Sequence, residues 1–232
     1  MAKFCTKCGA KLVDGACPNC KDGKEQMEEK KGITFQPEEM ITTIKGMFTK
    51  PIDTMKEVIE GENVTLSLIF LGINALFIAL FCCLGSKELF GAYTNQYSYF
   101  MIERTVDIPY ARIFFTSFVT VIATYVVIAG LFYLIVDKLF QGKTTFQKMI
   151  AYLGISSVIV SATMIVTMIF MYVSTQLMLL FLMCGLVLSS VYMIQGFRYT
   201  TEIDKNYVGY VYALVYLVVF IITMFIMPNI FQ

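Results

Sequence analysis

The chain has 232 residues, of which 57% are hydrophobic, and its mean hydropathy is +0.70. Soluble domains are usually about 45–50% apolar, so this composition indicates a membrane protein that crosses the bilayer several times. The net charge of +1 excludes the strongly basic surface typical of nucleic-acid binding. Histidine is absent, which excludes Ser-His-Asp triads, HExxH metal sites and histidine proton relays. An enzyme is therefore the least favoured class.

Two Cys-x2-Cys pairs lie near the N-terminus, formed by Cys5 with Cys8 and by Cys17 with Cys20. Four thiolates at this spacing complete the tetrahedral shell that structural Zn²⁺ prefers. A redox Cys-x-x-Cys site would look the same locally, but it needs a surrounding βαβ domain. We predict a zinc ribbon over residues 1–21 that holds one structural Zn²⁺ per chain. The segment resembles the short zinc-ribbon modules at the start of many bacterial membrane proteins.

Residues 22–35 are charged and lack apolar periodicity, which is typical of a flexible linker. Two short amphipathic helices are predicted over residues 36–62, beginning at Pro37 and Pro51, with Gly61 ending the second. The first helix carries one apolar stripe, formed by Met40, Ile41, Ile44, Met47 and Phe48. Both helices are too short and too charged to span a bilayer. Because no other soluble apolar surface is available for packing, we expect them to lie on the membrane surface.

The membrane domain, residues 63–232, is predicted to be all-α with five transmembrane helices. The expected spans are at about residues 64–84, 113–136, 149–173, 177–196 and 207–227, and Asn63 can cap the first. The apolar block from Met149 to Gly196 contains no charged residue. As one helix it would measure about 72 Å, more than twice the hydrocarbon thickness, so it must form a hairpin. The polar interruption Ser174-Thr175-Gln176 predicts the turn.

Five spans place the two termini on opposite faces of the membrane. With the N-terminus inside, 15 of the 18 Lys and Arg residues lie on the inner side and 3 on the outer side. This asymmetry predicts a protein of the cell membrane with a cytosolic N-terminus and an outer C-terminus. The zinc ribbon then lies in a reducing compartment, where thiolates remain free to hold metal.

Small and polar residues inside the spans predict how the helices associate. Gly154, Ser157 and Ser161 share a face of the third span, and Gly185 and Ser189 share a face of the fourth. This spacing favours a close packing seam between the two arms of the hairpin, with a substrate path lined by the hydroxyls as the alternative. A helix–helix hydrogen bond is expected for Asn74 and for Gln195. No span carries a charge near its middle, which disfavours ion-coupled transport.

Several other residues receive ordinary membrane roles. The segment from Gly85 to Arg112 is expected to be an outer loop whose aromatic residues belong to the interfacial belt. The same role is expected at the head of the fifth span for Tyr207, Tyr210, Tyr212 and Tyr216. We expect the remaining cysteines to be small buried hydrophobic residues; they are Cys82, Cys83 and Cys184.

From about residue 47 to residue 227 the chain resembles the YIP family of five-span membrane proteins, named after Ypt-interacting members. The resemblance rests on Lys50-Pro51-Ile52-Asp53 before the first span, Gly142-Lys143-Thr144-Thr145-Phe146 and Gly154-Ile155-Ser156 at the third, and Gly196-Phe197-Arg198 after the fourth. The zinc ribbon points to a bacterial chain, in which prenylated Rab-type GTPases are not expected. We therefore do not carry a GTPase-binding role over.

The leading hypothesis is a noncatalytic integral membrane protein that organises a membrane complex or the shape of the membrane. Its expected partners are the lipid bilayer and other proteins, which would dock through the zinc ribbon and the faces of the spans, and no nucleic acid. The alternative is a small permease, or an accessory subunit of an exporter, that uses the seam of the third and fourth spans as a path.

Overall fold

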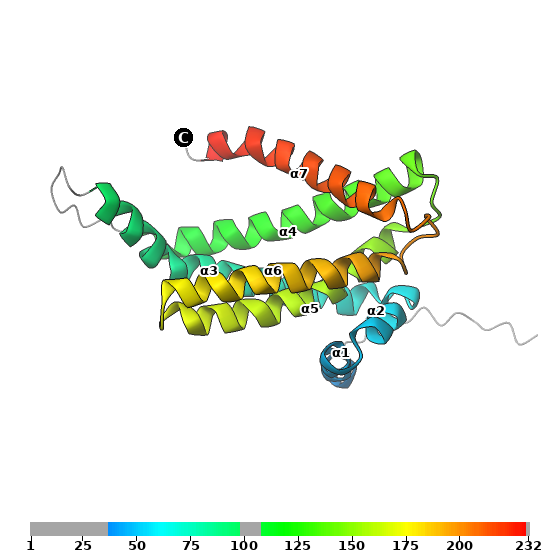
Figure 1. Cartoon of the computed structure of the whole chain (residues 1–232), viewed down its shortest axis with the longest axis horizontal. Helices are drawn as coiled ribbons and strands as arrows, with labels where there is room; N and C mark the ends of the chain where they lie inside the picture. Colours follow the sequence, from blue (N-terminus) through cyan, green and yellow to red (C-terminus); the bar gives the residue numbers. More distant parts are fainter. Residues whose placement is uncertain (1–36, 98–107, 231–232) are drawn as a thin grey trace, which may run out of the picture. The chain divides into compact units, whose positions relative to one another are not determined.

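The computed structural model describes residues 37–97 and 108–230 of the chain (Figure 1). Every regular element in these ranges is helical, which confirms the all-α prediction for this part of the protein. The elements are α1 (Pro37–Thr49), α2 (Pro51–Glu60), α3 (Val64–Tyr97), α4 (Tyr110–Leu134), the π-helical turn η1 (Ile135–Leu139), α5 (Phe146–Met171), α6 (Thr175–Phe197) and α7 (Val208–Ile230). The four predicted zinc ligands, Cys5, Cys8, Cys17 and Cys20, lie outside the described residues.

Four of the described helices are long and apolar enough to cross a membrane, and these lie within Val64–Ser86, Tyr110–Leu139, Phe146–Met171 and Thr175–Phe197. α7 adds a shorter apolar helix, Val208–Ile222. The chain is therefore a multi-pass helical membrane protein.

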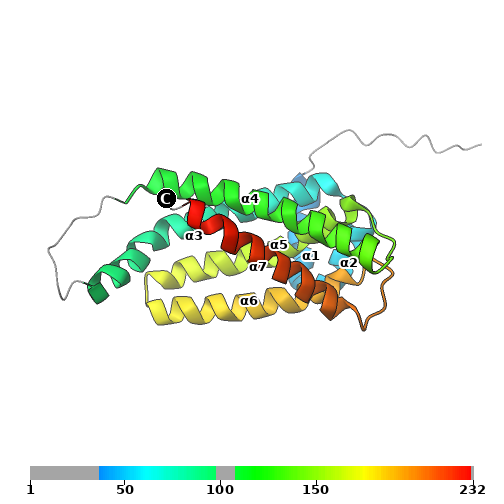
Figure 2. The same ribbon diagram turned by 90° about the horizontal axis from the view of Figure 1, so that it is seen from above.

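α5 is the central helix of the bundle. It packs against α3 on one side and against α6 on another, and α4 lies beside α3. Figures 1 and 2 show these four helices running in the same general direction, with α7 crossing α4 obliquely. Of the most apolar part of α5, 56% is buried within the protein, compared with 17% for α6. Most of the surface of α6 is thus left to face lipid.

Local capping explains where the helices begin. Asn63 Oδ1 accepts a hydrogen bond from the amide of Leu66 at 3.2 Å, which caps α3 as expected. Thr145 caps α5 by accepting from Lys148 N at 3.1 Å. Ser174 caps α6 by accepting from Gln176 N at 3.2 Å. The turn between α5 and α6 therefore falls at the polar interruption that the sequence contains.

The expected outer loop is wrong over much of its length. α3 continues through Tyr97 and α4 begins at Tyr110, so the segment from Gly85 to Arg112 is helical at both ends. A drop in hydrophobicity does not by itself end a helix, and residues 85–97 contain no proline that would. Residues 98–107 lie outside the described part of the chain.

The α1–α2 pair has a protein partner that the sequence did not predict. α2 packs against α5 and α6, and Met55 and Ile59 are fully buried there. Gly196 of α6 makes this contact possible, because Met55 Cε occupies the position that a Cβ would need. The expectation that these helices have no apolar surface to pack against is therefore wrong.

Candidate functional site

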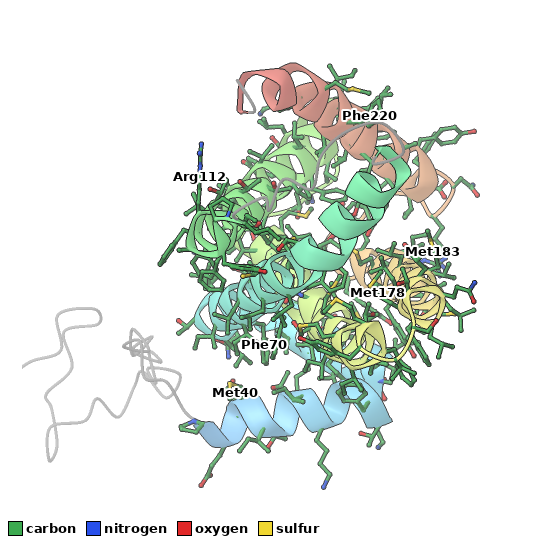
Figure 3. All side chains as sticks on the ribbon, turned by 90° about the vertical axis from the view of Figure 1, so that its left-hand side faces the viewer. Met40, Phe70, Arg112, Met178, Met183 and Phe220 are labelled. Carbon is green, nitrogen blue, oxygen red and sulfur yellow. The ribbon has the colours of Figure 1, made fainter. Side chains whose placement is uncertain are left out.

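The surface formed by α1 and α2 is here called the platform. Its first helix, α1, runs in a different direction from the long helices. Figure 3 looks along the bundle and shows α1 lying across it, with Met40 pointing toward the long helices. When the long helices cross a bilayer, α1 therefore lies parallel to the plane of that bilayer. This is the orientation of an interfacial helix.

The apolar stripe of α1 is divided between the protein and the surroundings. Met47 is buried, and Met40 and Ile44 pack partly buried against the same core. Ile41 and Phe48 remain 61% and 63% exposed. The exposed Lys45 lies between them on the same face, at the i+4 position of an i, i+4, i+7 series. One face of α1 thus anchors the helix, and a second presents two large apolar side chains beside a cation.

Close contacts hold the platform in place. A Cβ on Gly46 of α1 would lie 2.5 Å from Thr54 Oγ1 of α2. The side chain of Thr54 therefore packs directly against the backbone of α1 at Gly46. Asn63 Nδ2 at the start of α3 donates to Glu39 Oε1 of α1 at 2.6 Å. Together with the buried Met55, these contacts attach the platform to the bundle at several points.

The stretches that carried the family resemblance meet beside this platform. Gly196 contacts Met55, four residues after Pro51. Thr144 Oγ1, just before α5, donates to Thr200 O just after α6 at 2.8 Å. A Cβ on Gly142 would lie 2.5 Å from Ile203 Cγ1. Segments from before the first span, before the third and after the fourth therefore form one end of the protein.

An aromatic cluster joins four helices at this end of the bundle. Phe132 of α4, Tyr152 of α5, Phe197 of α6 and Tyr212 of α7 pack with ring centroids between 5.1 and 6.0 Å apart. Tyr212 donates to Met193 O at 2.8 Å, and its hydroxyl also bonds that of Tyr152. Each hydroxyl thus has a partner inside the protein, as buried tyrosines require.

Tyr212 therefore does not belong to the interfacial belt, and that expectation is wrong for this residue. The other three tyrosines at the head of α7 are exposed: Tyr207 (50%), Tyr210 (69%) and Tyr216 (43%). In the structure Tyr212 lies next to the buried stripe of Val208, Val211 and Val215. The sequence carries no signal that separates the four tyrosines, because this helix is apolar on every side.

The predicted seam of small residues between the hairpin arms is right for Gly185 of α6 and wrong for the small residues of α5. A Cβ on Gly154 would collide with Ser67 of α3, so the face with Gly154, Ser157 and Ser161 packs against α3 and not against the other arm of the hairpin. The arms of the hairpin meet elsewhere, where a Cβ on Gly185 of α6 would collide with Thr163 of α5. α5 thus makes a close helix–helix contact on each of two faces, one with α3 and one with α6.

Asn74 makes the predicted helix–helix hydrogen bonds. It is fully buried, and its Nδ2 donates to Ser157 O at 3.3 Å and to Ser161 Oγ at 3.0 Å. Tyr125 OH of α4 donates to Asn74 Oδ1 at 2.6 Å, so the cluster joins α3, α4 and α5. The hydroxyls of Ser157 and Ser161 donate to Gly154 O and Ser157 O. Their protons are used inside the protein, which is the arrangement of a structural cluster and not of a substrate path.

Gln195 and the three apolar cysteines differ from expectation. Among the described residues, the amide of Gln195 has no hydrogen-bond partner. Cys82 and Cys83 are half-buried, and Cys184 is exposed. The cysteines are not buried inside the protein because the surrounding bilayer is itself apolar, so a residue such as Cys184 can face lipid without cost.

Within the described ranges, no group of His, Cys, Asp and Glu side chains could hold a metal ion.

The arrangement defines a multi-pass helical membrane protein with a short-helix platform packed on one end. The family model of the Yip1 domain matches residues 45–227, which is most of the chain. The protein therefore belongs to the Yip1 family, and the family resemblance seen in the sequence is confirmed. No curated protein and no solved structure is detectably similar to this chain.

Proposed function

We propose that the protein is a noncatalytic protein of the cell membrane that shapes the bilayer and assembles partner proteins at its inner face. The observation that carries this proposal is the orientation of α1. It lies across the bundle with Ile41 and Phe48 exposed, while α2 is buried against α5 and α6.

This geometry suits a wedge in one leaflet. An interfacial helix buries its apolar side chains roughly 5–10 Å into the boundary between headgroups and acyl chains. Lys45 can extend its stem over this apolar surface and keep its ammonium group among the phosphates. Because α1 is attached to the bundle, each inserted protein adds area to the same leaflet, and unequal leaflet areas favour curvature.

The remaining parts of the proposal follow from the sequence. α7 supplies a fifth span, so that the termini lie on opposite sides of the membrane. The platform and the four N-terminal cysteines are then cytosolic, as the excess of Lys and Arg on that side favours. A zinc ribbon held by Cys5, Cys8, Cys17 and Cys20 serves as the docking module for partner proteins, joined to the platform by the charged linker.

Vesicle remodelling tests the proposal. The full chain is reconstituted into large vesicles, and vesicle diameter is measured by electron microscopy for the wild type and for Ile41→Ser with Phe48→Ser. We expect the wild type to give narrower or tubular vesicles and the double variant to leave the diameter unchanged. Thr42→Ala with Thr49→Ala is the matched control, because both threonines are exposed on α1 but lie away from the Ile41–Phe48 face.

Two outcomes would contradict the proposal. One is equal remodelling by the wild type and by the Ile41→Ser, Phe48→Ser variant at equal protein density. The other is solute flux by the purified protein alone that Ser157→Ala or Ser161→Ala abolishes, which would replace the proposal by the permease.

A further inference from the structure

An apolar groove of about 680 Å³ runs along the exposed, lipid-facing side of α6 and ends against the start of α2. Its floor follows one stripe of α6, which includes Met183, Val187, Val191 and Gln195, and Pro51 and Ile52 of α2 form the wall at one end. The groove exists because Gly196 allows Met55 to approach α6, which brings the first turn of α2 over the end of that helix.

The length of the groove matches one acyl chain. Met183 and Gln195 are separated along α6 by about 18 Å at the usual helical rise. One leaflet of a bilayer contributes about 15 Å of hydrocarbon, half of the full thickness. The groove therefore extends from the platform end of the bundle to about the middle of the membrane, and no farther.

Gln195 is the polar residue at the platform end of the groove, and two cationic residues lie close to this end along the chain. Gln195 lines this end with an amide that has no hydrogen-bond partner in the described part of the chain. Arg198 is exposed and follows Gln195 by three residues, which places it on the same face of α6. Lys50 is exposed and directly precedes Pro51. Among the described residues, Lys56 and Lys138 pair with carboxylates, whereas Lys50 and Arg198 have no ion-pair partner.

We propose that this groove binds one anionic glycerophospholipid, with an acyl chain along Met183 to Val191 and the phosphate between Lys50 and Arg198. The amide of Gln195 donates to the ester or phosphate oxygens. A cation beside an apolar slot of one-leaflet length complements a lipid that has a negative headgroup and a long apolar tail. The inference goes beyond the proposed function and does not rest on it, because it requires only that α6 cross the bilayer.

The absence of tryptophan from the chain allows a site-specific test. Val187→Trp places a single fluorophore in the groove at a side chain that is 66% exposed. Leu217→Trp is the matched control on α7, where the side chain is 57% exposed. Both positions lie about 14–15 Å along their helices from the platform end. Fluorescence quenching is measured in bilayers that mix phosphatidylcholine and phosphatidylglycerol, with either lipid carrying brominated chains.

At Val187→Trp we expect the anionic lipid to bind about 25-fold more strongly than the zwitterionic lipid, because each of the two juxtamembrane cations contributes about fivefold. At Leu217→Trp the ratio should be near one. Adding Lys50→Gln and Arg198→Gln to Val187→Trp should lower its ratio to near one and leave quenching by brominated phosphatidylcholine unchanged. If Val187→Trp does not fold, Val191→Trp probes the same groove.

Three results would overturn the proposal. The first is the same ratio at the two tryptophans. The second is a ratio at Val187→Trp that survives the removal of both cations. The third is no quenching there by any brominated lipid, which would mean that another protein surface covers the groove. None of these results bears on the remodelling by Ile41 and Phe48, so failure of one proposal is distinguishable from failure of the other.

Discussion

At the scale of single residues, three glycines set the distances between helices. Gly154 admits Ser67 of α3, Gly185 admits Thr163 of α5, and Gly196 admits Met55 of α2. Between membrane helices the hydrophobic effect provides little attraction, so close packing of this kind supplies much of the stability. A side chain at Gly154 would be the hardest of the three to accommodate, because the opposing atoms include the Cα and carbonyl oxygen of Ser67 and these cannot rotate away.

We predict that Gly154→Ala lowers the free energy of unfolding by about 1–3 kcal/mol, the usual cost of overpacking a well-packed site. Gly72→Ala is the matched control, because a Cβ on Gly72 of α3 would have no neighbour within 4 Å. This control should be neutral or stabilising by up to about 1 kcal/mol, since alanine is the better helix former. Unfolding of the detergent-solubilised protein is the measurement. Equal stability of the two variants would show that α3 and α5 are not in close contact.

At the scale of elements, α1 and α2 have different attachments although both are short and amphipathic. α2 places Met55, Val58 and Ile59 in the protein core. In α1 only Thr43 and Met47 are buried, and two large apolar side chains are exposed. The difference follows from position, because α2 lies over the ends of α5 and α6 whereas α1 lies at the periphery. α2 is therefore the anchor of the platform and α1 its exposed part.

Truncation of one side chain from each helix tests this difference. Met55→Ala should destabilise the protein by about 2–5 kcal/mol, the cost of removing a fully buried large side chain. It should also speed tryptic cleavage after Lys56, because α2 would separate from the bundle more often. Phe48→Ala should leave both quantities nearly unchanged in detergent, since that side chain is 63% exposed. Similar protease resistance in the wild type and in Met55→Ala would argue against the anchor.

At the scale of the whole molecule, the described core belongs to the compact unit of residues 36–232. The buried core residues of the described chain lie between Met47 and Val215; α2 contacts α5 and α6, and α7 contacts α4 and α6. The backbone hydrogen bonds of the helices are satisfied within each helix, as a bilayer requires. The predicted zinc ribbon is therefore expected to be separable from the membrane domain.

Replacement of two zinc ligands tests this separation. Cys5→Ser with Cys8→Ser should remove about one Zn²⁺ per chain, because the remaining two thiolates cannot fill a tetrahedral shell. Metal analysis of the purified protein gives the zinc content, and gel filtration in detergent reports on the membrane domain. We expect loss of zinc, an unchanged elution profile and loss of crosslinked neighbours in native membranes. Aggregation of the double variant would show that the ribbon belongs to the core fold.

The features that the sequence by itself determined are local ones. Pro37, Pro51 and Gly61 mark the boundaries of α1 and α2, Asn63 caps α3, and the polar interruption after α5 contains the turn to α6. Each of these depends on the backbone chemistry of a few neighbouring residues. Long apolar runs likewise show that the helices cross a membrane, because the length and composition of one segment are sufficient for that conclusion.

Only the tertiary structure decided which faces of the helices meet. Gly154 faces α3 instead of α6, Tyr212 points inward while Tyr210 points outward, and Met55 finds a partner on α6. In a soluble protein, the apolar side of a helix marks its buried face. A membrane helix is apolar on every side, since both protein and lipid surround it with hydrocarbon, and its sequence therefore carries little information about which side faces the protein.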